Sequence, residues 1–110
     1  MYSISYYIPA DAHERVKQAL FACGAGKTGR YDECCWEVLG HGQFRAQKGS
    51  KPTIGKIDQL EQLAEFKVEM VCEDQLIRKV VETLLREHPY EQPAYFFHPV
   101  MTISDLQTGS

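Results

Sequence analysis

A short run of chemically capable side chains, His88-Pro89-Tyr90-Glu91, stands out in this sequence of 110 residues. It places an imidazole, a phenol and a carboxylate close together, and these groups can bind ligands, bind metal ions or transfer protons. A helical pattern of apolar residues ends at this run, and Pro89 disfavours an α conformation at His88. We therefore expect the run between a helix and a final strand, as a ligand site, a subunit contact or only a helix stop.

A second candidate is the glycine-rich run over residues 24–31, which reads Gly-Ala-Gly-Lys-Thr-Gly-Arg-Tyr. It matches G-x-G-x-x-G, but it follows a predicted helix and precedes a strand, the reverse of a dinucleotide-binding loop. Its glycines could still form a nest of backbone N–H groups for a small anion, with charge from Lys27 and Arg30. In the alternative, Gly24 ends the helix and the other glycines shape a turn. The candidate ligand-binding residues of both runs are Gly24, Gly26, Lys27, Gly29, Arg30, Tyr31, His88, Tyr90 and Glu91.

The spacing of apolar residues predicts the elements that must position these groups. Alternation of apolar and polar residues indicates strands, and apolar residues three and four positions apart indicate two helices. Gly40-His41-Gly42 is expected to turn one strand into a short next one, and residues 47–57 to form a polar surface loop. The predicted strands are 3–8, 33–39, 43–46, 66–72 and 93–100, and the helices are 11–23 and a second one that begins after residue 73 and ends at residue 88.

The order of these elements, β-α-β-β-β-α-β, predicts an α+β fold. The expected architecture is a ferredoxin-like antiparallel sheet with two helices on one face and an inserted hairpin. Residues 1–101 are expected to form one domain and residues 102–110 a flexible tail. Tyr95 and Phe97 should lie on one side of the last strand, and Phe96 and His98 on the other. Aromatic surface on the helix-free face predicts a homo-oligomer.

Composition excludes several classes of partner. A net charge of −3, with basic and acidic residues interleaved, does not suit nucleic acid. No apolar run reaches the ~20 residues of a membrane span, and no leader pattern is visible, so we expect a cytoplasmic protein with no membrane partner. No cofactor is implied, and the four cysteines are expected to be reduced and mostly structural.

Catalysis and metal binding find weaker support. No triad, nucleophile elbow or paired-carboxylate motif appears, so no catalytic residue is assigned and enzyme activity is not favoured. A soft-metal or redox site would have to use Cys34, Cys35, His41, His88 and His98. These residues lack the paired spacing of zinc ligands, and adjacent cysteines in a strand point to opposite faces. His13 is expected to be solvated on the polar side of the first helix, and Trp36 to lie in the core.

Several separated motifs together resemble the YqfO-type domain of the Nif-three-like family. They are the glycine run with Tyr31, Cys34 and Trp36, Gly40-x-Gly42-x-Phe44, Gly49-x-x-Pro52-x-Ile54-Gly55, Glu61 and Glu65, and His88-Pro89-Tyr90-Glu91 with Ala94-Tyr95. In many bacterial members this domain is inserted between two halves that build a dinuclear metal centre. Here it is expected to stand alone, so no residue is assigned to that centre and no metal ligand is predicted. Departures from the family pattern are Thr28, Ala46, Gln92 and Phe96, which replace an aliphatic residue, a proline, a second glutamate and an acidic residue.

The resemblance implies a fold like those of CutA and PII-like signalling proteins. Such proteins are typically trimers that bind small ligands or metal ions in clefts between subunits. The implied function is a non-enzymatic, oligomeric ligand-binding or regulatory module, as a trimer or dimer. The glycine run and the His88–Glu91 run would converge across a subunit seam around a small anionic ligand. A protein–protein interaction module and a protein that binds soft metal cations remain the alternatives.

Overall fold

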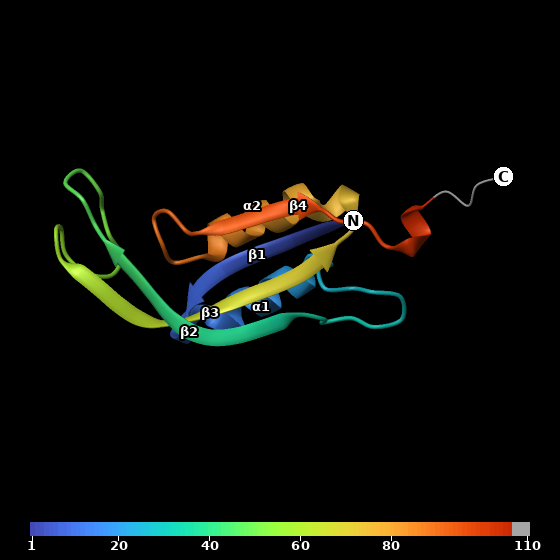
Figure 1. Cartoon of the computed structure of the whole chain (residues 1–110), viewed down its shortest axis with the longest axis horizontal. Coiled ribbons are helices and arrows are strands. Elements are labelled where there is room, and N and C mark those ends of the chain that lie inside the picture. The colour runs from blue at the N-terminus through green and yellow to red at the C-terminus, as the bar shows by residue number, and fades with distance from the viewer. Residues whose placement is uncertain (107–110) are drawn as a thin grey trace.

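The structure, a computed structural model, describes residues 1–106 as one four-stranded antiparallel sheet covered on one face by two helices (Figure 1). The strands lie in the order β2-β3-β1-β4. This arrangement confirms the ferredoxin-like α+β fold. The elements are β1 Tyr2–Pro9, α1 His13–Ala22, β2 Trp36–Arg45, β3 Leu60–Cys72, α2 Ile77–Glu87 and β4 Tyr95–Pro99, with 3-10 turns at Ala10–Ala12, Asp74–Leu76 and Ile103–Asp105.

The core lies between the helices and one face of the sheet. Alternate residues of β1 and β3 point into it, because successive side chains of a strand face opposite sides. The two helices add an apolar stripe each. The main buried side chains are Ile4, Tyr6, Ile8, Val68, Met70 and Cys72 from the strands, and Val16, Leu20, Val80 and Leu84 from the helices.

One strand prediction was wrong. Gly40-His41-Gly42 does not form a turn, because β2 runs through it without a break and pairs with β3 from Trp36 to Arg45. The sheet therefore has four strands rather than five, and no inserted hairpin is present among residues 1–106. The true hairpin joins β2 to β3 through residues 46–59, roughly where the polar loop was predicted.

The two long strands project beyond the rest of the sheet. Pairing of β1 with β3 stops at Pro9 opposite Glu65, whereas β2 and β3 stay paired out to Arg45 opposite Leu60. Residues 41–64 thus form a two-stranded arm, visible on the left of Figure 1, which extends the molecule to 60 × 25 × 23 Å.

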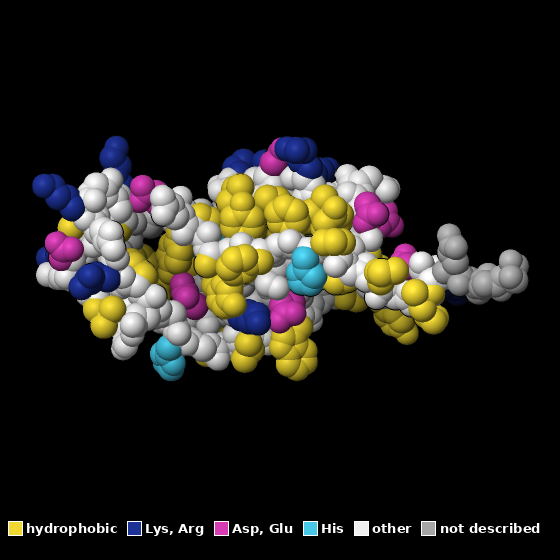
Figure 2. Space-filling view, turned by 45° about the horizontal axis from the view of Figure 1, so that its top comes forward, with side chains coloured by type: hydrophobic (Ala, Val, Ile, Leu, Met, Phe, Trp, Pro, Cys, Tyr) yellow, Lys and Arg dark blue, Asp and Glu magenta, His cyan; other side chains and the backbone are white. Residues whose placement is uncertain are grey.

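The opposite sheet face carries no helix, and we call it the open face. In β4, Phe96 lies opposite Ser5 and His98 opposite Ser3, whereas Tyr95 and Phe97 pair with core positions of β1, as predicted. The open face exposes large apolar side chains, several of which form the central yellow area of Figure 2. Its most exposed ones are Trp36 (69%), Val38 (49%) and Phe96 (65%). The prediction that Trp36 lies in the core was therefore wrong.

Part of the predicted C-terminal tail forms a short capped turn. Thr102 and Asp105 form a reciprocal capping box around the Ile103–Asp105 turn, while residues 107–110 of the predicted tail lie outside the described part. No helix within residues 1–106 has the length and apolar character that crossing a membrane requires.

Candidate functional site

The His88–Glu91 run begins as predicted, at the end of α2. His88 has extended backbone angles, φ −69° and ψ 133°, so the helix stops before Pro89. Its side chain is 5% exposed. The Tyr90 N–H donates to His88 Nδ1 at 3.1 Å, so the ring proton resides on Nε2, which donates to the Tyr7 carbonyl at 2.6 Å. Burial lowers the pKa of His88, against the opposing effect of that carbonyl. His88 is therefore neutral, and its hydrogen bond to Tyr7 joins the His88–Glu91 run to the end of β1.

Tyr90 is tied to the base of the arm. Its hydroxyl donates to Glu65 Oε2 at 2.8 Å. Burial, together with this hydrogen bond, raises the pKa of Tyr90, so the phenol stays protonated at neutral pH. Glu65 reaches Tyr90 by crossing over Gly42, where an added Cβ would lie 1.8 Å from Glu65 Oε1. Gly42 thus marks a close approach of a side chain to a strand rather than a turn.

The loop at the tip of the arm folds back onto the His88–Glu91 run. The Lys51 N–H donates to Glu91 Oε2 at 2.8 Å, and the Thr53 hydroxyl donates to the Pro89 carbonyl at 2.8 Å. The rings of Phe44 and Tyr90 pack at an incline of 55°, with centroids 6.2 Å apart. Segments separated by 36 to 40 residues in the sequence are thereby joined into one wall.

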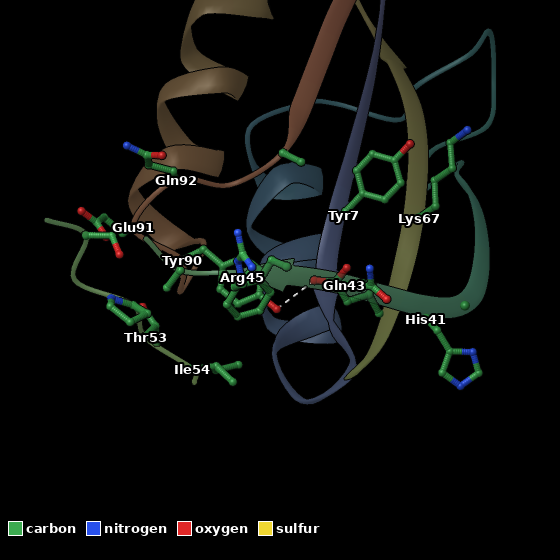
Figure 3. Close-up of a pocket in the computed structure, with 18 of the residues that line it drawn as sticks. Tyr7, His41, Gln43, Arg45, Thr53, Ile54, Lys67, Tyr90, Glu91 and Gln92 are labelled. Carbon is green, nitrogen blue, oxygen red and sulfur yellow. Dashed lines mark hydrogen bonds between the residues drawn. The ribbon is translucent and has the colours of Figure 1, made fainter. Parts of the chain in front are cut away.

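These contacts enclose a groove of about 780 Å³ between the arm, residues 90–94 and the open face of the sheet. Figure 2 shows it as the hollow between the arm and the body, and Figure 3 shows its side chains. Its lining combines rings, aliphatic groups and charges, and includes Tyr7, Val38, Phe44, Ile54, Lys67 and Tyr90. This volume and mixture are typical of a small-molecule site.

Two cations border the groove. Arg45 closes β2 and forms no ion pair within residues 1–106, and Lys67 lies 3.4 Å from Glu69 on the open face. In Figure 3, Tyr7 and Lys67 lie side by side on neighbouring strands, whereas His41 points away from the other labelled residues. The groove can thus offer rings to a flat group and positive charge to an anionic one.

The glycine run is built mainly as a structural loop. Gly24, Gly26 and Gly29 all have positive φ, and Gly24 follows the last turn of α1 as the predicted helix stop. The Gly26 N–H donates to Val71 and its carbonyl accepts from Cys34, both at 2.8 Å. The N–H groups of Thr28 and Tyr31 donate to each other's carbonyls. Most of these amides are therefore committed to the fold, and Lys27 and Arg30 are exposed.

The two candidate runs do not meet within one chain. The glycine run is anchored near Val71, whereas the His88–Glu91 run is anchored at Tyr7 and Glu65. Val71 lies six positions after Glu65 along β3, which is about 20 Å at the usual rise of a strand. Figure 1 shows the two loops at opposite ends of the sheet. Their convergence across a subunit seam stays a prediction.

The residues of the soft-metal hypothesis are also dispersed. Cys34 and Cys35 precede β2 instead of lying in a strand, and both nitrogens of His88 are engaged within the protein. His41 and His98 lie on β2 and β4, at opposite edges of the sheet. Among residues 1–106, metal-type ligand atoms gather at a different place, at His13, Glu14 and Glu37.

The prediction that His13 is solvated was wrong, because its side chain is 2% exposed. His13 shares the buried face of α1 with Val16 and Leu20, and it was assigned to the polar side because of its residue type. His13, Val16 and Leu20 are spaced three and seven positions apart, so the helical period itself carried the signal.

Segments similar to this chain occur inside longer bacterial proteins. The chain is 40% identical over 89 residues, 81% of its length, to a Mycobacterium tuberculosis protein named GTP cyclohydrolase 1 type 2 homolog. It spans about a quarter of that relative, 24% of its length. It also superposes on 26% of a Bacillus cereus protein related to NIF3, with a TM-score of 0.77 and 32% identity over 92% of this chain. The chain is homologous to one segment of the Nif-three-like family. No protein-family model matches the sequence.

The chain shares its fold with two further groups of solved structures. CutA1 from Pyrococcus horikoshii superposes with a TM-score of 0.68 and 15% identity, over 96% of this chain and 88% of the other. A Bacillus subtilis GlnK–ATP complex superposes with a TM-score of 0.58 and 14% identity, over 91% of this chain and 82% of the other. At such identities the likeness shows the fold alone, and it confirms the expected CutA/PII-like architecture.

Proposed function

We propose that this protein is a non-enzymatic, oligomeric ligand-binding or regulatory module that holds a small ring-bearing anion in the groove between the arm and the His88–Glu91 run. The observation that carries the proposal is the closure of that groove. Hydrogen bonds from Lys51 and Thr53 to the His88–Glu91 run form one wall of the groove. The groove has the volume and the lining that are typical of small-molecule sites.

The chemistry of the groove favours a ligand with a flat ring and a negative group. Phe44 and Tyr90 offer aromatic surface, and Arg45 and Lys67 offer positive charge at its border. The raised pKa of Tyr90 keeps its hydroxyl protonated and bonded to Glu65 at neutral pH, so this residue offers its ring to a ligand and is not poised to abstract a proton. An adenine nucleotide has both features, and the GlnK structure of similar fold is a complex with ATP.

Assembly with further copies of the chain is supported by the open face. Trp36 and Phe96 expose most of their surface there, on opposite edge strands. Monomeric proteins rarely leave such aromatic surface uncovered, and a second copy of the same face is the simplest cover. The glycine run of one copy could then approach the groove of another.

ATP is the probe for the groove, measured by thermal unfolding of the full chain in EDTA. At a concentration 100 times its dissociation constant, ATP should stabilise the protein by about 2.7 kcal/mol, a rise in Tm on the order of 10 °C. Gly42→Ala should reduce this rise, because the added methyl displaces Glu65 from Tyr90.

Gly40→Ala is the matched control. Gly40 lies on the same strand and also lines the groove, but an added Cβ there meets nothing within 4 Å and leaves Glu65 in place. Its Tm rise with ATP should equal that of the wild type. The proposal fails if millimolar ATP leaves the wild-type Tm unchanged, or if Gly42→Ala and Gly40→Ala respond alike. Inorganic phosphate alone should give a smaller rise, because it cannot use the rings.

A further inference from the structure

A polar cluster lies on the helix-covered side of the sheet, apart from the groove. His13 and Glu14 occupy the first turn of α1, Lys17 the next turn, and Glu37 the start of β2. The ring of Phe66 stacks on His13, with centroids 4.2 Å apart and planes inclined by 18°. One ligand atom from each of His13, Glu14 and Glu37 lies within 4.8 Å of the others.

The ring nitrogens of His13 are buried, and one of them lies beside a carboxylate without a well-formed hydrogen bond. The side chain is 2% exposed, and neither ring nitrogen has a hydrogen-bond partner in the described chain. Nε2 does lie 3.0 Å from Glu37 Oε2, but the two atoms are not aligned as a hydrogen bond. Buried polar groups are nearly always satisfied, so an imidazole of this kind calls for a partner.

The centre of the cluster already accommodates a positive charge. The Lys17 ammonium lies 2.8 Å from Glu14 Oε1 and 2.9 Å from Glu37 Oε1. It thereby marks where two carboxylates can hold a cation. Lys17 hangs on a flexible four-carbon stem and keeps 13% of its side chain exposed, so the ammonium can move outward to solvent.

We propose that His13, Glu14 and Glu37 form a binding site for a divalent cation of the zinc type, which takes the place of the Lys17 ammonium. One imidazole and two carboxylates are a donor set that Zn²⁺ accepts, with a fourth position left to water. Donor atoms about 2.0–2.2 Å from an ion are roughly 3–4 Å apart, so side-chain rotation suffices to close the present cluster. Phe66 holds the imidazole plane in place for this.

The test titrates the full chain, freed of metal, with Co²⁺ as the spectroscopic probe and with Zn²⁺ as its competitor. Bound Co²⁺ should give visible absorption that Zn²⁺ abolishes. Glu37→Gln should weaken Co²⁺ binding about 10–100-fold. Lys17→Met should strengthen it, because the competing ammonium is gone and both carboxylates remain. His98→Asn, which removes an exposed imidazole on the open face, should bind Co²⁺ like the wild type.

Two outcomes would overturn the site. Equal Co²⁺ affinity in the wild type and Glu37→Gln would show that the ion binds elsewhere. Unchanged or weaker binding by Lys17→Met would show that the cluster is an ion-pair network only. Lys17→Met also separates a lost site from a misfolded protein, because only a folded variant that binds more tightly can show a larger Tm rise with Zn²⁺ than the wild type. The ATP experiment runs in EDTA, so failure of one proposal leaves the other intact.

Discussion

His88 has a side chain that often takes part in catalysis, but here it links the His88–Glu91 run to β1. Both of its nitrogens are engaged within the chain: Nε2 donates to the Tyr7 carbonyl, and Nδ1 accepts from the Tyr90 N–H, which requires the neutral ring. Protonation would place a proton on Nδ1, where the Tyr90 N–H points, and would charge a buried ring. The state of His88 therefore controls how firmly the His88–Glu91 run is held to β1.

Stability should fall in mild acid because of His88. Its pKa is lowered in the fold from 6.5, so the unfolded chain takes up the proton first. The stabilising contribution of the neutral ring is therefore complete above about pH 6.5 and is lost as the pH falls toward the lower, folded pKa. The free energy of unfolding, measured in urea, should decline there by at most about 1.4 kcal/mol per pH unit for this residue.

His88→Gln keeps a donor for Tyr7 but does not titrate. Below pH 6.5 its unfolding free energy should change less with pH than that of the wild type, whatever its absolute value. His98→Gln, at an exposed position, should keep the wild-type slope. An identical slope in the wild type and His88→Gln would contradict the role assigned to His88.

Single residues also mark the limit of the sequence reasoning. Pro89 sets the end of α2 through local sterics, so that boundary was predictable. Gly42 and Trp36 depend on partners distant in sequence: Gly42 accommodates Glu65, and Trp36 lies on a face that no helix covers. Local pattern assigned the first to a turn and the second to the core, because it contains no information about either partner.

Among the elements, the glycine run connects the end of α1 to β3 through backbone hydrogen bonds. Gly26 links Val71 and Cys34 through its own N–H and carbonyl, and its φ is +79°. An added Cβ would lie 2.8 Å from the Cys34 carbonyl oxygen and equally close to the Phe21 ring. Gly29 also has a positive φ, +60°, but nothing lies within 4 Å of its Cβ position.

Alanine at these two glycines should separate backbone strain from steric clash. Gly29→Ala should lose about 1 kcal/mol of unfolding free energy, from the left-handed backbone alone. Gly26→Ala should lose about 2–4 kcal/mol, because overpacking against Cys34 and Phe21 is added. Urea unfolding of both variants measures the difference. Equal losses would mean that the run is held less firmly than its contacts indicate.

The arm was the element that sequence pattern predicted least well. Alternation identified β1 and the second half of β3, which bury one face against the helices. Residues 41–45 and 60–64 lie beyond the core, so neither face is selected to be apolar and the alternation fades. Consequently the groove, which the arm helps to build, could not be found from sequence, although two of the candidate ligand-binding residues, Tyr90 and Glu91, line it.

At the scale of the whole molecule, the open face should decide the oligomeric state. Trp36→Glu places a charge among exposed apolar side chains, and burial of that charge in a subunit contact would be costly. Light scattering coupled to size-exclusion chromatography should show an oligomer for the wild type and a smaller species for the variant.

Leu85→Glu provides the control for this prediction, because Leu85 is 43% exposed on the helix layer, away from the open face. It should keep the wild-type mass. A monomeric wild type, or loss of assembly in both variants, would argue against the open face as the contact.

The first and last strands bring Met1 and Val100 together. The Val100 N–H donates to the Met1 carbonyl at 3.0 Å, at the edge of the molecule opposite the arm. A host protein could therefore open one surface loop by only a few ångströms and accept the whole unit there, with its own chain leaving and returning at nearly the same point. The arm and its groove would then project away from the host, at the far end of the inserted unit.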